Sequence, residues 1–156
     1  MKASTLPATD PMNVYLIGNN PIELSSIYDK LKTNFRAEIC FELKGLYSKI
    51  RRFRPQCILI DDNLDRVMIK KILRRLSSRN ITRDIPVTII KNNNYTEGFS
   101  EAQDFVLKNE LTSEGLSRSI KNSIRMKRMQ YYLIRKYRKN KGRIQNWWSV
   151  ISGSEA

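Results

Sequence analysis

The sequence predicts an α/β protein in which helices cover both faces of a five-stranded parallel sheet. The first observation is that short apolar runs alternate five times with amphipathic helical patterns over about 115 residues, as right-handed strand–helix–strand crossovers do. The second is the run at 57–60, which is apolar at every position and so predicts a central strand covered on both faces. The chain has 156 residues, enough to bury one such core without disulfides or metals.

A first strand and helix follow a leader at residues 1–12 that we expect to be flexible. The strand is predicted at 13–17, where the sequence reads NVYLI. Asn20 is placed to cap the helix, and Pro21 takes its first position, where the missing N–H of proline does no harm. Apolar residues at helical spacing then predict a helix from Pro21 to Phe35.

The next elements lead to the central strand. Residues 37–43 alternate apolar with polar side chains, which favours a partly exposed edge strand. Gly45 begins a short helix that Pro55 ends, directly before the strand at 57–60. After that strand, apolar residues between 67 and 76 recur at helical spacing with Lys and Arg between them, which predicts a helix lying on the sheet.

Two strands and a helix complete the predicted fold. Residues 85–90 (IPVTII) predict the fourth strand and residues 105–107 the fifth. Between them, 96–102 has the length for one or two helical turns, but it contains a glycine and has little apolar face. Thr112 and Ser113 can cap the last helix.

At this size the expected strand order is 2-1-3-4-5, the flavodoxin-like order. The strands that carry Cys40 and Cys57 would then be separated by another strand and lie about 9–10 Å apart, too far for a disulfide. The cysteines have no metal-ligand spacing, and the chain contains no histidine. A His-dependent catalytic triad and a His-ligated zinc site are therefore excluded.

Two adjacent carboxylates, Asp61 and Asp62, follow the central strand. Ligands bind at the carboxyl edge of an open α/β sheet, so these acids are the first candidates for function. A structural interpretation competes with this one, because Asp and Asn at a strand exit also form Asx-turns and cap the next helix. The residues alone leave both interpretations open.

Three strings carry a resemblance to a known family. PQCILIDDNL, IPVTII and DFVLKNELTSEGLSRSIKNSI resemble the third strand, the fourth strand, and the fifth strand with the last helix of the receiver domain of bacterial two-component response regulators. The resemblance implies a receiver-like domain at 13–128. It makes Asp61 the candidate phosphoacceptor and puts Lys108 at the position of the family's invariant lysine.

The sequence departs from this family where receivers bind Mg²⁺. Receivers have an acidic pair after the first strand, and the matching residues here are Gly18 and Asn19, neither of which ionises. Lys91 replaces the small hydroxyl residue that follows the fourth strand. Asp61 and Asp62 are then nearly alone in attracting a metal that must neutralise phosphoryl oxygens.

These departures predict a degenerate pseudo-receiver. We expect Lys91 and Lys108 to point at the pocket that holds Asp61 and to neutralise its carboxylate, which disfavours Mg²⁺. The prediction is no metal site and no cofactor, with Mg²⁺ needed only in the alternative that Asp61 is phosphorylated. In a third interpretation, compatible with the first, the three residues form a relic salt-bridge cluster that ties loop ends together.

The formal net charge of +14 is concentrated near the C-terminus, and the rest of the chain has 18 basic and 15 acidic residues. We expect the last helix to continue as a basic extension at 129–148, followed by a disordered tail at 149–156. The segment from Arg118 to Arg143 contains no acid and eleven basic residues, namely Arg118, Lys121, Arg125, Lys127, Arg128, Arg135, Lys136, Arg138, Lys139, Lys141 and Arg143.

Three interpretations compete for this extension. Met126, Met129, Leu133 and Tyr137 share a helix face, which suits a homodimer. Cations interleaved with aromatic residues suit sequence-tolerant binding of nucleic acid, and they also suit an anionic membrane surface or an acidic protein partner. The candidate contact residues are Arg125, Lys127, Arg128, Arg135, Lys136, Arg138, Lys139, Trp147 and Trp148.

With the departures noted above, the resemblance implies a stand-alone signalling protein of the bacterial cytoplasm that acts by protein contact without phosphorylation. No nucleotide-binding loop, nucleophile with a base or metal cage indicates an enzyme. An FMN binder would share the fold, but the loop GNNPIE at 18–23 lacks a phosphate cradle. No apolar stretch is long enough to span a membrane, and the leader lacks the apolar centre of a signal peptide.

Overall fold

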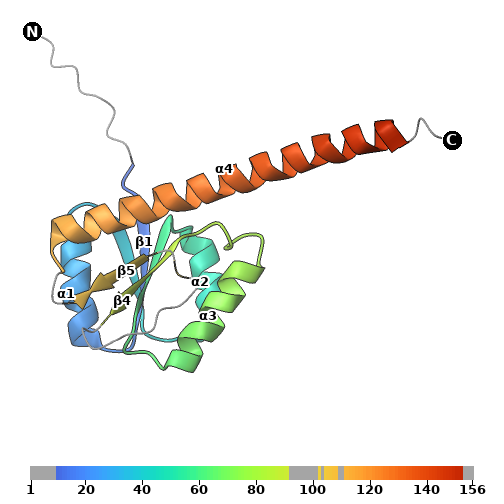
Figure 1. Cartoon of the computed structure of the whole chain (residues 1–156). Coiled ribbons are helices and arrows are strands. Elements are labelled where there is room, and N and C mark those ends of the chain that lie inside the picture. The colour runs from blue at the N-terminus through green and yellow to red at the C-terminus, as the bar shows by residue number, and fades with distance from the viewer. Residues whose placement is uncertain (1–9, 92–101, 103, 109–110, 153–156) are drawn as a thin grey trace, which may run out of the picture.

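The computed structural model describes residues 10–91, 102, 104–108 and 111–152. Its five strands form one parallel sheet in the order β2-β1-β3-β4-β5, with helices on both faces (Figure 1). The predicted fold class and strand order are confirmed. The strands are β1 (Asn13–Ile17), β2 (Arg36–Cys40), β3 (Cys57–Asp61), β4 (Val87–Lys91) and β5 (Asp104–Leu107).

The central strand is β3, which lies between β1 and β4. All five of its residues are buried, as its unbroken apolar run predicts. The parallel register pairs Ile17 with Ile60, and Asp61 with Ile90. The carboxyl ends of β1, β3 and β4 therefore meet at one edge of the sheet, where Asp61 lies.

The helices cover the two faces in pairs. Leu24 of α1 and Ile120 of α4 are buried together on one face, and Ile50 of α2 and Ile72 of α3 are buried together on the other. Cover on both faces explains why strands such as β3 are apolar throughout. The helices that the structure describes are α1 (Pro21–Leu31), α2 (Leu46–Phe53), α3 (Arg66–Ser78) and α4 (Ser113–Ser152).

The two cysteines do not form a disulfide. Cys40 lies at the end of β2 and Cys57 at the start of β3, both are buried, and β1 separates their strands. The prediction that they do not form a disulfide is confirmed.

Helix α1 begins as predicted and ends early. The Asn20 side chain accepts hydrogen bonds from the backbone N–H groups of Ile22 and Glu23, so the predicted N-cap is confirmed. The helix ends at Leu31 and not at Phe35. Thr33 donates its hydroxyl to the carbonyl of Lys30, which is the local competition that makes threonine a poor residue in a helix interior.

Three other features differ from the sequence prediction. β2 ends at Cys40, so it does not reach residue 43. β4 begins at Val87, because Pro86 before it has no N–H to give to the sheet. Val67 is 71 % exposed, since it lies about 200° around α3 from the buried Ile69 at roughly 100° per residue.

Two predicted segments fall outside the described part of the chain. The flexible leader was predicted at 1–12, and only residues 10–12 of it are described. The helical turns at 96–102 coincide almost entirely with the gap at 92–101. Both predictions stay untested.

Helix α4 has two parts, and Figure 1 shows it running well past the sheet. In residues 113–124, the docked part, Leu116, Ile120 and Ile124 are buried against the sheet. In residues 125–152, the free part, large apolar side chains such as Met129 and Leu133 are more than half exposed.

The free part is longer than the predicted extension. The helix passes Gly142 without a break and ends at Ser152, beyond the range 129–148 and inside the range predicted as a disordered tail, 149–156. Glycine in a helix costs about 1 kcal/mol relative to alanine, which the surrounding strong helix formers can offset. Within the described residues, no helix combines the length and apolar character needed to cross a bilayer.

A buried polar pair also holds α4 on the sheet. The hydroxyls of Thr88 in β4 and Ser123 in α4 lie 2.9 Å apart, and both residues are buried. Thr88→Val leaves the Ser123 hydroxyl without this partner, and we expect the free energy of unfolding to fall by about 1–3 kcal/mol in urea titrations. The double variant Thr88→Val/Ser123→Ala removes both hydroxyls and should recover most of that loss. A double variant as unstable as the sum of the single ones would contradict this account.

Candidate functional site

The candidate site lies at the carboxyl edge of the sheet, where three strands place one residue each. Gly18 follows β1, Asp61 ends β3, and Lys108 follows β5. The Asp61 side chain has no exposed surface, and Lys108 is 16 % exposed. A carboxylate and an ammonium group are therefore held together largely away from water.

Lys108 bridges three carboxylates. Its Nζ lies 2.6 Å from Oδ1 of Asp61, 2.9 Å from Oε2 of Glu23 and 3.4 Å from Oδ1 of Asp62. The first two distances are those of charge-assisted hydrogen bonds, and the third is a weaker ion pair. One ammonium group thus joins acids from α1 and from the end of β3. We call Glu23, Asp61, Asp62 and Lys108 the acid cluster.

Glu23 was not among the site residues predicted from the sequence. Its carboxylate accepts hydrogen bonds from Lys108 and from the side-chain amide of Asn63. The signal that could have found it is its position in the first turn of the helix after β1. Such a turn begins at the same sheet edge as the end of β3.

The ionisation of these groups is coupled through Lys108. Burial raises the pKa of Asp61, and the hydrogen bond and charge of Lys108 offset only part of that rise. Burial lowers the pKa of Lys108, but hydrogen bonds to Asp61 and Glu23 outweigh it, so this pKa lies above its usual value. The hydrogen bond from Lys108 holds the pKa of Glu23 below its usual range. Lys108 is therefore charged at neutral pH and draws the carboxylates together.

Gly18 and Asn19, the residues matched to the receivers' acidic pair, provide no carboxylate. A Cβ atom at Gly18 would lie 2.8 Å from a methyl carbon of Leu24 and 3.1 Å from Cβ of Asp61. The Asn19 amide instead donates to the backbone carbonyl of Asn63 at 3.5 Å. The core residue Leu24 fills space that a side chain at position 18 would need.

Restoring an acid at position 18 should destabilise the protein. Gly18→Ala places a Cβ against Leu24 and Asp61, and we expect it to lower the free energy of unfolding by about 1–3 kcal/mol. Gly18→Asp adds a like charge beside Asp61 and should cost more than Gly18→Ala at neutral pH. Lowering the pH toward 4 protonates carboxylates and should narrow the gap between the two variants. Urea titrations at both pH values measure this gap, and a gap that does not change would contradict the charge argument.

The structure places Lys91 differently from Lys108. Its Nζ lies 3.8 Å from the centroid of the Phe105 ring on β5, a cation–π contact. The sequence analysis expected both lysines at Asp61, whereas the ion pair seen at Asp61 comes from Lys108. A neutralising role for Lys91 at the pocket stays a prediction.

The resemblance to receivers implies Mg²⁺, and the side chains present do not form a site for it. Mg²⁺ requires about six oxygen ligands in near-octahedral geometry. Within the described residues, no group of three or more His, Cys, Asp or Glu side chains is arranged to hold a metal ion. Oδ2 of Asp61 is buried with no hydrogen-bond partner in that part of the chain, but Oδ1 of Asp61 and Oε2 of Glu23 face Lys108.

The acid cluster also corrects the sequence-based charge balance. The sequence analysis described Asp61 and Asp62 as nearly alone, whereas Glu23 adds a third carboxylate beside them. The pocket has therefore not lost its anions. The oxygen atoms of the three carboxylates converge on an ammonium group.

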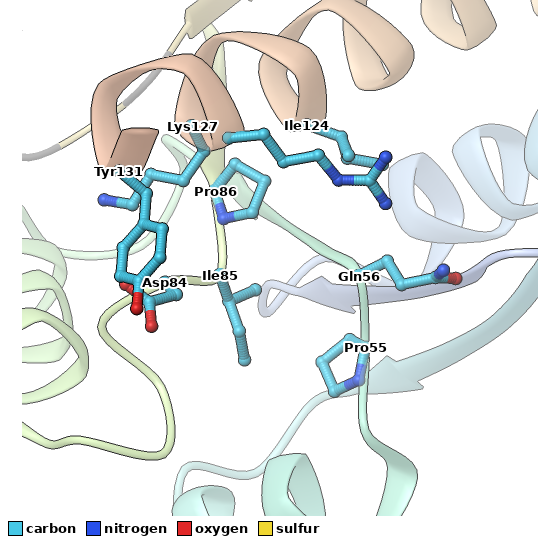
Figure 2. Close-up of a pocket in the computed structure, with 9 residues that line it drawn as sticks. Pro55, Gln56, Asp84, Ile85, Pro86, Ile124, Lys127 and Tyr131 are labelled. Carbon is cyan, nitrogen blue, oxygen red and sulfur yellow. The ribbon is translucent and has the colours of Figure 1, made fainter. Parts of the chain in front are cut away.

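The predicted contact residues for a partner all lie on α4, away from the acid cluster. Nearest to the domain, an open hollow of about 410 Å³ lies beneath the helix at the amino edge of the sheet, opposite Asp61. Figure 2 shows the Tyr131 side chain extending from α4 toward Asp84, with Ile85 and Pro86 beside them. The hollow is lined by Pro55, Gln56, Asp84, Ile85, Pro86, Ile124, Lys127, Arg128 and Tyr131.

No protein-family model matches the chain, and no curated protein matches it. Several solved structures do match the chain. The receiver domain of a sensor histidine kinase from Pseudomonas aeruginosa, solved with a magnesium ion in its active site cleft, is 19 % identical, covers 73 % of this chain and 98 % of its own, and has a TM-score of 0.62.

Two response regulators give the same result. A signal receiver domain from Bacteroides fragilis is 20 % identical over 74 % of this chain and 98 % of its own, with a TM-score of 0.61. A chemotaxis response regulator of Vibrio cholerae is 13 % identical over 72 % of this chain and 98 % of its own, also with a TM-score of 0.61. At these identities the similarity is one of architecture. The chain therefore has the fold of response regulator receiver domains.

Proposed function

We propose that this protein is a receiver-like signalling protein of the bacterial cytoplasm that acts by protein contact, without phosphorylation of Asp61 and without enzyme activity of its own. The observation that carries the proposal is the 2.6 Å contact between Nζ of Lys108 and Oδ1 of Asp61. The receiver fold supports a signalling role. The acid cluster supports independence from phosphorylation.

A phosphoacceptor carboxylate must attack phosphorus while a metal neutralises the phosphoryl oxygens. In this protein, Oδ1 of Asp61 is held by an ammonium group, and the charge beside it is a compact point charge that cannot coordinate several oxygens at once. Glu23 and Asp62 are drawn to the same ammonium. The cluster therefore favours one closed arrangement of the loops at this edge.

Intact-mass spectrometry tests the proposal directly. The full chain is incubated with Mg²⁺ and a small phosphodonor such as acetyl phosphate, beside the Asp61→Asn variant. We expect no added phosphoryl mass on either protein. An addition on the parent that is missing from Asp61→Asn would refute the proposal.

One observation favours a second candidate function, phosphorylation of Asp61. Its Oδ2 atom has no hydrogen-bond partner within the described residues, and the carboxylates of Glu23 and Asp62 lie beside it. A rotation of Lys108 away from Oδ1 would then be needed before a metal could bind. Under this candidate, the phosphodonor labels the parent, and Glu23→Gln reduces the labelling.

A further inference from the structure

The free part of α4 carries an apolar stripe along one side. Its members are exposed by 47–67 %, far more than core residues, although they are large and apolar. Their spacing of three, four or seven residues keeps them on one face of the helix, and Asn140 interrupts them once. The stripe consists of Met126, Met129, Leu133, Tyr137, Ile144 and Trp147.

The stripe does not face the sheet. Leu116, Ile120 and Ile124 mark the side of α4 that packs on the domain. At roughly 100° per residue, the stripe lies about 140° around the helix from that side. A flat surface could therefore contact the stripe while the domain stays on the opposite side of the helix.

Basic side chains border the stripe between residues 125 and 143. No aspartate or glutamate occurs from residue 115 to residue 152. Paired with a second copy, whether parallel or antiparallel, the stripe would bring these cations against each other with no acid between them, which is destabilising. The border cations are Arg125, Lys136, Lys141 and Arg143.

We propose that the stripe is a docking surface for an anionic membrane, on which the free part of α4 lies flat. An interfacial helix combines an apolar face with a polar face rich in Lys and Arg, and its apolar residues enter the boundary between headgroups and acyl chains. From Met126 to Trp147 the stripe extends about 33 Å at 1.5 Å per residue. Trp147 and the adjacent Trp148, which is 60 % exposed, suit the headgroup level, where tryptophan is enriched.

The apolar stripe and the bordering cations together favour an anionic membrane as the binding partner. Nucleic acid would use the cations and the tyrosines, but it offers nothing to Met126, Leu133 or Ile144. A second copy would cover the stripe, but its cations would lie against the cations of the first copy. An anionic bilayer binds both the apolar stripe and the cations, and it does not require a partner helix aligned in a matching register. The membrane would then hold the receiver-like domain where it can meet a protein partner.

Binding is measured by sedimentation of the full chain with vesicles of phosphatidylcholine, with and without about one third phosphatidylglycerol. Trp147 and Trp148 are the two tryptophans of the chain, so they report insertion directly. We expect binding to the anionic vesicles alone, a blue shift of tryptophan emission, and loss of binding as salt rises.

A matched pair of variants separates the stripe from general charge attraction. Leu133→Gln removes an apolar side chain that is 55 % exposed on the stripe, and Ile134→Gln removes one that is 50 % exposed about 100° around the helix from Leu133. Neither change alters the net charge. We expect Leu133→Gln to weaken binding to anionic vesicles about tenfold and Ile134→Gln to change it less than twofold.

Three outcomes would overturn the proposal. The first is no binding to anionic vesicles. The second is binding with no blue shift and with equal affinity for both variants, which charge alone would produce. The third is a dimer of the full chain, measured by sedimentation equilibrium, that Leu133→Gln dissociates, because a second copy would then cover the stripe.

Discussion

Replacing Lys108 by methionine should lower the free energy of unfolding by about 3 kcal/mol at neutral pH, because it leaves a buried carboxylate without its partner. Asp61 has no exposed surface, and Lys108 supplies its ion pair at 2.6 Å. Glu23 and Asp62 then add repulsion that Lys108 no longer offsets. Urea titration of the parent and of Lys108→Met measures the loss.

The loss should depend on pH in a defined direction. Burial already raises the pKa of Asp61 above its unfolded value, and without Lys108 this pKa rises further. The native state then binds more protons than the unfolded state, so stability falls as pH increases from about 4 through the folded-state pKa. The difference between the parent and Lys108→Met should therefore be small near pH 4 and widen toward pH 7.

At alkaline pH, the parent protein should lose the stabilisation that Lys108 contributes. The pKa of Lys108 is raised in the folded state, so its contribution is complete below the unfolded value of about 10.4 and is lost as pH rises through the folded value. Lys91→Met is the matched control, since this lysine lies over Phe105, and it should cost less than about 1 kcal/mol. Equal losses for the two lysine variants would contradict the assignment of Lys108 to Asp61.

A second large effect is expected in the docked part of α4. Ile120→Ala should lower the free energy of unfolding by about 2–4 kcal/mol, because Ile120 is fully buried against the sheet. Ile134→Ala, in the free part, should change it by less than about 0.5 kcal/mol, because this side chain is 50 % exposed. Thermal and urea unfolding of both variants measure the contrast.

This contrast tests whether the free part of α4 is dispensable for folding. A chain that ends after Arg128 should then be as stable as the parent within about 0.5 kcal/mol. If Ile134→Ala or this truncation destabilised the protein as much as Ile120→Ala, the free part would be a structural element of the domain. A role for it in docking would then lose its main support.

The fold could be predicted because sequence patterns specify it locally. The apolar run at 57–60 required cover on both faces, and the structure buries every residue of β3. Asn20 and Pro21 specified the start of α1 through capping chemistry. Boundaries were less predictable, because the ends of α1 and β2 depend on single hydrogen bonds and on where the sheet ends.

The acid cluster was only half predictable. Strand order brings Lys108 to the sheet edge where Asp61 lies, but β4 separates their strands, so the contact itself depends on the reach of the lysine side chain. Glu23 was missed because site carboxylates were sought directly after the strands, whereas Glu23 lies in the first turn of α1. The contact of Lys91 with Phe105 depends on side-chain packing between β4 and β5, which no sequence spacing reports.

We propose that the ammonium group of Lys108 takes the place that a divalent metal would need beside Asp61. Thermal unfolding with and without about 10 mM Mg²⁺ tests it most directly, because any ligand that binds only the native state raises the melting temperature. The account predicts the same melting temperature for the parent in both conditions. A rise with Mg²⁺ that disappears in Asp61→Asn would show that the metal displaces Lys108, and it would contradict the account.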